Sequence, residues 1–270
     1  MEKITTLIVD KTGTLTLGKP ILSLVQTFNG FSEDEVLAVA ASLEKESEHP
    51  LAEAIIHGAK SKNIASVDAK NFESLTGLGV RGLVNDKEIL LGNKRLLNQF
   101  NINTDELVIA AEKLQSSGHG VMLVAINKKP AGVIAVKDPI KETAKDAISY
   151  FHEKNIEVIM LTGDNHLTAK VIAAEIGIDH FEAEVLPNQK NEVVRRLQGQ
   201  RKIVAMAGDG INDAPSLAQA DVGIAMGTGT DIAMESASIT LVKGDLMGIV
   251  RAHQLSNQTM KNIKQNLFFA

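Results

Sequence analysis

The sequence predicts an α/β protein with a doubly wound parallel sheet, interrupted by an α+β segment that has an antiparallel sheet. Residues 4–9 form a short, apolar, largely β-branched run without helical periodicity, as expected of a strand buried on both faces. From residue 138 onward, strand and helix patterns alternate, which is typical of parallel sheets with right-handed crossovers. Between these parts, residues 72–136 contain extended runs joined by short turns, the pattern of antiparallel hairpins.

Composition bounds the class of protein. The 270 residues are 44% hydrophobic and 23% charged, values typical of a soluble globular chain with one large or two ordinary domains. A net charge of −5 gives no electrostatic reason to expect a nucleic-acid partner. The absence of cysteine excludes disulfides and thiolate metal sites. We expect no signal peptide, and no apolar run approaches the roughly 18 residues that span a bilayer.

Helix signals frame the middle of the chain. The capping box that begins at Ser32 predicts a helix carrying an apolar stripe as far as Leu43. Pro50 at a first-turn position predicts the start of a second helix, and Thr104 that of a third, which ends near Gly118. Between and after these helices, extended runs are predicted at 72–75, 80–84, 88–91, 121–126 and 132–136. This part of the chain therefore predicts an α+β unit.

The second half of the chain alternates between the two patterns. We predict helices at 140–153, 169–176 and 187–199 and strands at 156–161, 203–207 and 222–225. The first strand has the same character as these later ones, so the economical arrangement is one domain made of two pieces around an insertion. The expected domains are 1–18 with 138–258, the insertion 19–137, and 259–270 as the start of a further helix. The chain ends apolar and uncapped, and we expect it to be a segment cut from a longer protein.

Polar side chains follow three of the strands predicted for the parallel sheet. Asp10 comes directly after the first strand, in a turn of hydroxyl residues around Gly13. Thr162 follows the strand at 156–161, and Asp209 and Asp213 follow the strand at 203–207. Ligands of open α/β sheets bind outside the carboxyl ends of the strands. We therefore expect these side chains to form one site.

The residue types at this edge suit phosphoryl transfer. A carboxylate such as Asp10, ringed by backbone N–H groups and hydroxyls, can act as a nucleophile toward a phosphoryl group. The carboxylates of the later loop are hard-oxygen ligands of the kind that Mg²⁺ takes, and Lys190 can supply a point charge to phosphate. Each feature alone also fits a capped turn, an acidic turn or a solvated lysine. Four such features together, namely the three loops at strand ends and Lys190, favour a functional site.

Three motifs carry a resemblance to a known family. Residues 10–16 (DKTGTLT), 162–165 (TGDN) and 208–215 (GDGINDAP) resemble the signatures of P-type ATPases, which belong to the haloacid-dehalogenase-like superfamily. In the insertion, residues 47–51 (SEHPL) and 77–82 (GLGVRG), with the Gly92-Asn93 pair, resemble the heavy-metal branch. The resemblance covers nearly the whole chain. It implies a haloacid-dehalogenase-like phosphorylation domain interrupted by a nucleotide-binding domain.

The resemblance also implies roles for individual residues. Asp10 would be the residue phosphorylated by ATP, and Thr162 and Lys190 would hold the phosphoryl oxygens. Mg²⁺ would be bound by Asp10, the backbone carbonyl of Thr12 and Asp209, with Asp213 supporting. The residues implied to contact ATP are Glu44, His49, Gly77, Gly79 and Asn93.

The nucleotide assignments have weaker support from the residues themselves. Glu44 and His49 fall at the end of one predicted helix and the start of the next, where they could share the rim of a pocket. The GxGxxG pattern at 77–82 opens no helix, because Val80 onward has the pattern of a strand; this argues against a dinucleotide-binding fold.

Thr12 distinguishes two kinds of enzyme within the superfamily. Soluble phosphatases of this type generally place a second aspartate two residues after the nucleophile, as a general acid/base worth roughly 10²–10⁴-fold. Here that position is Thr12, so an aspartyl phosphate is expected to persist, as a pump requires. Two alternatives stay open: a free-standing phosphatase of this superfamily and a non-catalytic nucleotide-binding module.

A pump needs parts that this chain does not contain. The resemblance implies partners in the same polypeptide, namely membrane helices and an actuator domain, with the heavy-metal cation bound elsewhere. The segment itself is expected on the cytosolic side of a membrane. Glu48 before His49 favours copper over zinc, by resemblance only. ATP bound to the insertion must reach Asp10, so hinges are predicted near residues 18–20 and 138–139.

Overall fold

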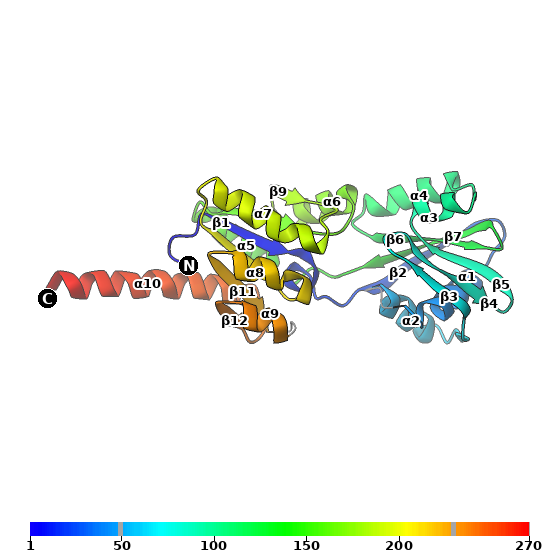
Figure 1. Cartoon of the computed structure of the whole chain (residues 1–270), viewed down its shortest axis with the longest axis horizontal. Coiled ribbons are helices and arrows are strands. Elements are labelled where there is room, and N and C mark those ends of the chain that lie inside the picture. The colour runs from blue at the N-terminus through cyan, green and yellow to red at the C-terminus, as the bar shows by residue number, and fades with distance from the viewer. Residues whose placement is uncertain (48–50, 228–230, 270) are drawn as a thin grey trace. The chain divides into compact units, whose positions relative to one another are not determined.

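A computed structural model describes residues 1–47, 51–227 and 231–269, which form two compact units (Figure 1). Unit 1 consists of Met1–Gly18 together with Ile140–Ala270, and unit 2 consists of Lys19–Pro139. The N-terminal strand thus belongs with the second half of the chain.

Unit 1 is built on a parallel sheet. Among the described residues its strand order is β12-β11-β10-β1-β8-β9, with every neighbouring pair parallel. The strands are β1 (Thr6–Asp10), β8 (Glu157–Leu161), β9 (His180–Glu182), β10 (Val204–Gly208), β11 (Val222–Met226) and β12 (Ile239–Leu241). All five residues of β1 are buried, which confirms the prediction of a strand covered on both faces. Its central position brings the carboxyl ends of β1, β8 and β10 together.

Helices cover both faces of this sheet. They are α5 (Ala144–Glu153), α6 (His166–Ile176), α7 (Pro187–Gly199), α8 (Ala214–Gln219), α9 (Asp231–Ser236) and α10 (Met247–Phe269). Leu7 and Val9 of β1 pack into a core with α5 and α6. Ile8, which points to the opposite face, packs with α7. Each face thus has its own hydrophobic core, as the doubly wound fold requires.

Two predicted helix starts in unit 1 were wrong. The helix predicted from residue 140 begins only at Ala144, because Ile140 forms a bridge with Thr16 and continues the strand-like path of the chain. The helix predicted from residue 169 begins three residues earlier, since the Asn165 side chain caps it by accepting a hydrogen bond from Thr168 N at 3.0 Å.

Helix α10 runs without interruption from Met247 to Phe269. Its first turns are buried through Ile249, Val250 and His253 against the core shared with α5. Its last residues, including Phe268 and Phe269, are exposed. Within the described part of the chain, no helix combines the length and apolar character needed to cross a membrane.

Unit 2 is built on an antiparallel sheet of order β2-β7-β6-β5-β4-β3. The strands are β2 (Ile21–Thr27), β3 (Lys70–Leu75), β4 (Gly79–Val84), β5 (Lys87–Gly92), β6 (Gly120–Ile126) and β7 (Lys129–Lys137). The predicted hairpins are confirmed, and the structure joins them into one sheet. Strand β2 was not predicted from the sequence; it pairs with β7, more than a hundred residues later.

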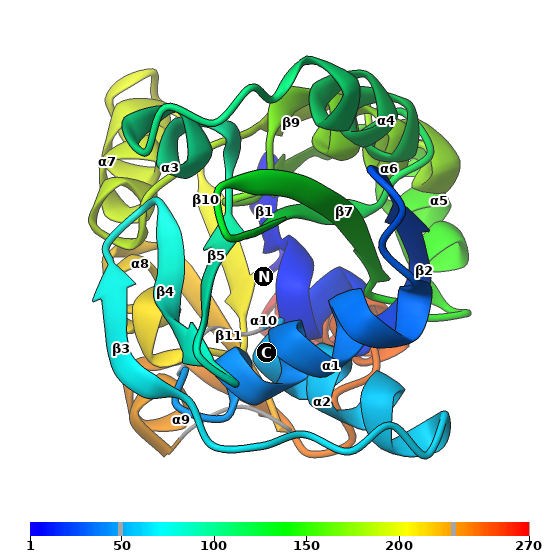
Figure 2. The same cartoon turned by 90° about the vertical axis from the view of Figure 1, so that its right-hand side faces the viewer.

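Helices lie on both sides of this sheet (Figure 2). They are α1 (Glu33–Glu44), α2 (Ala52–Ser61), α3 (Lys94–Gln99) and α4 (Asp105–Gln115). One core packs α1 and α2 against the sheet, and a separate core packs α3 and α4 against its other face. Ser32 caps α1 by accepting a hydrogen bond from Glu35 N at 3.1 Å. The prediction that Pro50 opens the second helix lies outside the described residues.

Candidate active site

Asp10 is the last residue of β1, the strand that lies between β8 and β10. Its side chain is nearly buried, with 6% of the residue exposed. The chain then turns tightly through residues 11–15, where Gly13 adopts a positive φ of 71°. An apolar strand therefore delivers one carboxylate to the edge of the sheet at which ligands of such folds bind.

Lys190 reaches this carboxylate from α7. The helix begins at Pro187, and Lys190 lies in its first turn, 8% exposed. Its Nζ donates hydrogen bonds of 2.7 Å to Oδ1 of Asp10 and 2.7 Å to Oδ1 of Asp213. Because the ammonium group lies between two buried carboxylates, it compensates for charge that would otherwise be costly to bury. A solvated surface lysine is thereby excluded.

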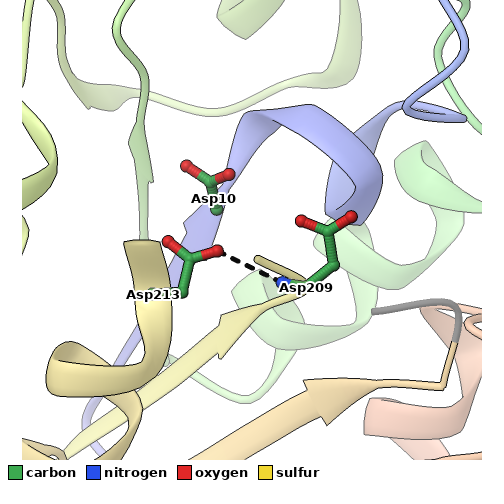
Figure 3. A group of neighbouring side chains, drawn as sticks. All are labelled: Asp10, Asp209 and Asp213. Atoms are coloured by element: carbon green, nitrogen blue, oxygen red, sulfur yellow. Dashed lines mark hydrogen bonds between the residues drawn. The ribbon is translucent and has the colours of Figure 1, made fainter. Parts of the chain in front are cut away.

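Asp213 holds the loop after β10 in shape. Its Oδ2 accepts hydrogen bonds from the backbone N–H groups of Asp209 at 3.2 Å and Gly210 at 3.1 Å. Its carboxylate lies against Gly208, where an added Cβ would come within 2.7 Å of the Asp213 side chain. With Lys190 on its other oxygen, both oxygens of Asp213 have protein donors. Figure 3 shows Asp213 between the loop backbone and Asp10.

Asp209 lies against the loop at residues 11–15, which follows Asp10. A Cβ on Gly13 would be 1.6 Å from Oδ2 of Asp209, so only glycine allows this approach. The positive φ at Gly13 imposes the same restriction. The two loops, about two hundred residues apart in sequence, are therefore fitted to each other at this position.

Electrostatics at this edge favour binding of a cation. Burial, followed by the nearby Asp213 carboxylate, raises the pKa of Asp10 to about 7 even though Lys190 opposes the shift. Burial and Asp213 likewise raise the pKa of Asp209 to about 6, against the effects of Lys141 and Lys190. The two carboxylates hold the pKa of Lys190 above its usual value despite its burial.

The donor set fits a hard divalent cation. Asp10, Asp209 and Asp213 each offer a carboxylate oxygen, and these oxygens lie within 4.8 Å of one another (Figure 3). Oxygen-only sets with substrate completing the shell are typical of Mg²⁺ sites. Since Asp213 already has donors on both oxygens, Asp10 and Asp209 are the carboxylates best placed to ligate.

The third loop, after β8, reaches the same edge of the sheet. Thr162 is buried, and its Oγ1 accepts a hydrogen bond from Asp164 N at 3.1 Å. Asp164 in turn pairs with Lys11, with a distance of 2.9 Å between Oδ2 and Nζ. This ion pair joins the Thr162 loop to Lys11, the residue next to Asp10. Thr12 lies in the loop at residues 11–15 and is exposed.

In unit 2 the structure brings together three of the predicted nucleotide-binding residues. Asn93 caps α3 by accepting a hydrogen bond from Leu96 N at 3.1 Å, and its amide donates to the carbonyl of Gly77 at 2.8 Å. Gly77 has a positive φ and open space where a side chain would be. Gly79 cannot carry a side chain, because a Cβ would lie 2.3 Å from Leu91 O. The glycine loop thus presents bare backbone beside Asn93.

Glu44 is the last residue of α1 and is fully buried. Its carboxylate oxygens make no hydrogen bond of normal geometry to the described residues, although Ser47 is close enough to oppose the effect of burial on its pKa. Burial raises that pKa. A buried carboxyl with unmet hydrogen-bonding capacity is a group that a polar ligand can satisfy. His49, the remaining predicted nucleotide-binding residue, lies outside the described residues.

Sequence reasoning did not single out two lysines that the structure places at this site. Lys11 belongs to the motif at residues 10–16, but only the structure pairs it with Asp164. Lys141 Nζ donates to the carbonyl of Gly13 at 2.5 Å and opposes the rise in the pKa of Asp209. Nothing in the sequence around Lys141 indicates a role at the site, because it follows a proline-containing connection and belongs to none of the three motifs.

The fold and the site together define the class of the protein. The parts of a haloacid dehalogenase-like hydrolase are an aspartate at the end of a central parallel strand, a lysine that bridges it to the acidic loop after β10, and a threonine turn after the neighbouring strand β8. The family model of that description matches residues 4–221. Within this class, the chain belongs to the P-type ATPases, in their heavy-metal branch.

The chain is 51% identical to a copper-transporting P-type ATPase of Rhizobium leguminosarum bv. viciae, over 98% of this chain and 32% of that protein. It resembles a zinc-transporting PIB-type ATPase in the E2.Pi state (TM-score 0.75, 38% identity, 98% of this chain and 43% of that chain). It also resembles the catalytic domain of the CPx-ATPase CopB-B, in a structure concerned with nucleotide binding (TM-score 0.70, 32% identity, 92% of this chain and 88% of that chain). The chain thus spans about a third of the curated relative and most of an isolated catalytic domain.

Proposed function

We propose that this chain is the ATP-hydrolysing core of a heavy-metal cation-transporting P-type ATPase, in which Asp10 takes the γ-phosphoryl group of ATP. The observation that carries the proposal is the buried contact of Lys190 with Asp10 and Asp213, beside Asp209. A lysine held by two carboxylates is a preorganised positive charge next to the nucleophile, and such preorganisation is usually the largest contribution to catalysis of this kind.

In the proposed reaction a carboxylate oxygen of Asp10 attacks the γ-phosphorus in line with the leaving oxygen. The new bond joins this oxygen to phosphorus, the bond from the γ-phosphorus to the β,γ-bridging oxygen breaks, and ADP leaves with the electron pair. Lys190 would exchange its hydrogen bond with Asp10 for one to a phosphoryl oxygen. Thr162, at the end of the neighbouring strand, would hold a second phosphoryl oxygen.

The residues that would hold Mg²⁺ are Asp10, Asp209 and the backbone carbonyl of Thr12. Asp213 supports them through its hydrogen bonds to the loop and to Lys190. When bound, the cation would neutralise charge on the phosphates and the two carboxylates. The raised pKa values of Asp10 and Asp209 support this proposal, because uncompensated negative charge is what a divalent cation would relieve.

Thr12 sets the fate of the product. A threonine cannot act as the general base that a second aspartate provides in phosphatases, so hydrolysis of the aspartyl phosphate would be slow within this segment. Slow hydrolysis favours an energy-transducing cycle over simple phosphate release.

Unit 2 would hold the nucleotide. The described groups available to it are the open backbone at Gly77, the nearby backbone of Gly79, the amide of Asn93 and the buried carboxyl of Glu44. Together with His49, they form the proposed ATP site. The proposed hinges are the domain boundaries at residues 18/19 and 139/140. Rotation about them would bring ATP bound to unit 2 to Asp10.

The transported ion is proposed as copper, exported across the membrane by a full-length protein that contains this segment. This part of the proposal is supported by the names of relatives such as the copper-transporting ATPase of Rhizobium leguminosarum. Uptake of Cu⁺ into inverted vesicles that carry the full-length protein, measured against Zn²⁺, tests it. Transport of Zn²⁺ but not Cu⁺ would overturn it.

The core of the proposal is tested with ATP radiolabelled at the γ-phosphate and, in parallel, at the α-phosphate. The chain should become labelled in the presence of Mg²⁺ by the γ label only, and hydroxylamine should release the label because acyl phosphates react with it. Asp10→Asn, which keeps the size of the side chain, should take up no label. Rapid hydrolysis of p-nitrophenyl phosphate without a labelled intermediate would instead support a free-standing phosphatase.

A further inference from the structure

Lys141 connects two loops of unit 1 that are far apart in the sequence. It lies just before α5, and its Nζ donates hydrogen bonds to the carbonyl of Gly13 at 2.5 Å and to the carbonyl of Gly244 at 3.0 Å. Gly13 is the centre of residues 11–15, the loop that follows the proposed nucleophile Asp10 and is called the nucleophile loop below. Gly244 lies three residues before the start of α10. One ammonium group therefore contacts both the nucleophile loop and the segment just before α10.

On the catalytic side, Lys141 adds to a close fit around Gly13. The Asp209 side chain lies against Gly13, and the Lys141 ammonium holds the carbonyl of the same residue. Lys141 N also donates to Leu15 O at 2.9 Å. Two contacts from one residue thus fix both the middle and the end of the nucleophile loop. Movement of Gly13 toward a phosphoryl group on Asp10 would therefore displace the Lys141 ammonium.

On the other side, the same segment is fastened to the first turn of α10. Thr143 Oγ1 donates to Oδ1 of Asp245 at 2.9 Å, and that oxygen also accepts a hydrogen bond from Met247 N at 3.0 Å. Asp245 therefore caps α10 while it holds the residue two positions after Lys141. Displacement of Lys141 would be transmitted to the loop at 244–245, where α10 begins.

We propose that Lys141 is a positioning residue that links the nucleophile loop to the start of α10. Phosphorylation of Asp10 then changes how well ordered residues 244–249 are. The inference deepens the proposed function and rests on it for the phosphorylated state. Lys141 touches no reacting atom, so it acts through the backbone of Gly13 and Gly244. Its partners are carbonyl oxygens, and a cation donating to them forms a charge-assisted hydrogen bond.

The tie itself is tested without ligand, by hydrogen exchange of the backbone amides. Loss of a hydrogen bond from a charged group weakens local structure by enough to raise exchange roughly 10-fold or more. Lys141→Met should therefore speed exchange in two segments at once, at residue 16 and at residues 244–249. Lys141→Arg, which keeps the charge and the donors, should restore slow exchange in both. Lys145→Met, on an exposed lysine one turn further along, is the matched control and should change neither segment.

The transmission is tested with Mg²⁺ and beryllium fluoride, which mimics a phosphoryl group on a carboxylate. In the wild-type chain this ligand should slow exchange at residues 11–16 and also at residues 244–249. In Lys141→Met the slowing should remain at residues 11–16 and be lost at residues 244–249, and Lys141→Arg should restore it. A structural role alone would not make the second segment respond to a ligand bound at the first.

The outcomes separate this inference from the proposed function. Equal slowing at residues 244–249 in the wild type and in Lys141→Met overturns the transmission, and unchanged ligand-free exchange in Lys141→Met overturns the tie. If circular dichroism shows that Lys141→Met is unfolded, the wild-type chain still decides, because slowing confined to residues 11–16 contradicts the proposal. If the ligand slowed exchange nowhere in the wild type, the proposed function would be contradicted. The ligand-free comparison of the wild type with Lys141→Met would still test whether Lys141 links the two loops.

Discussion

The affinity of the site formed by Asp10 and Asp209 for Mg²⁺ should depend steeply on pH between 6 and 8. A cation that binds through carboxylates competes with protons for them, so a raised pKa extends that competition toward neutral pH. The pKa of Asp10 is raised to about 7 and that of Asp209 to about 6. Affinity should therefore rise with pH until both groups are ionised, because only the deprotonated oxygens are strong ligands.

The size of the effect follows from these two pKa values. At pH 8 both carboxylates are almost fully ionised, whereas at pH 6 about a tenth of Asp10 and about half of Asp209 are ionised. Where both must be ionised to bind, affinity should be about 20-fold weaker at pH 6 than at pH 8. In Asp209→Asn only the Asp10 contribution remains, about 10-fold. In Asp10→Asn only the Asp209 contribution remains, about 2-fold.

Isothermal titration calorimetry of the chain with MgCl₂ measures this directly. Repeating each titration in two buffers of different ionisation enthalpy also counts the protons released, which should exceed one at pH 6 and approach zero at pH 8. Affinity that is flat from pH 6 to pH 8 would refute the reasoning, since either the pKa values are not raised or these carboxylates do not bind the cation. An unchanged pH dependence in Asp10→Asn would refute the assignment to Asp10.

Three further predictions concern single side chains. Thr12→Asp should shorten the lifetime of the phosphoenzyme by roughly 10²–10⁴-fold, because it supplies a general base; an unchanged decay of label in a chase with unlabelled ATP would contradict this. Lys190→Met should raise the pKa of Asp10 still further and move the acid limb of the rate of phosphoenzyme formation to higher pH, whereas a profile matching the wild type would exclude Lys190 from the site. Glu44→Gln should weaken ATP binding and increase the free energy of unfolding at pH 7 relative to the wild type. The folded-state pKa of Glu44 is raised, so its protonated form stabilises the fold at low pH and this stability is lost as pH rises; urea unfolding from pH 4 to 8 should show a smaller decline for the variant, and an equal decline would contradict it.

Much of the fold could be predicted because burial leaves a local pattern. The apolar run around Ile8 and the alternation of strands and helices after residue 138 predicted the parallel sheet. Strand β2 escaped prediction because only Val25 in it is fully buried while Ile21 and Leu24 are exposed. Its pairing with β7, which no local pattern reveals, determines that it is a strand.

The candidate site was predictable in outline for a topological reason. Parallel strands end at a common edge, so Asp10, Thr162 and Asp209 could be expected together once their strands were recognised. Lys190 could be named but not shown to be buried, because nothing near it in the sequence distinguishes a buried from a solvated lysine. Lys141 was missed for the same reason, since its partners are backbone carbonyls at residues 13 and 244.

The most direct test of the account is the location of the phosphoryl group. The chain is incubated with Mg²⁺ and ATP, quenched in acid and treated with borohydride, which reduces an aspartyl phosphate to homoserine and so marks the residue permanently. Peptide mass spectrometry should then find homoserine at position 10 and none at positions 209 or 213, and none at all without ATP. Homoserine at another aspartate, or a phosphoryl group retained in Asp10→Asn, would contradict the claim that Asp10 is the nucleophile.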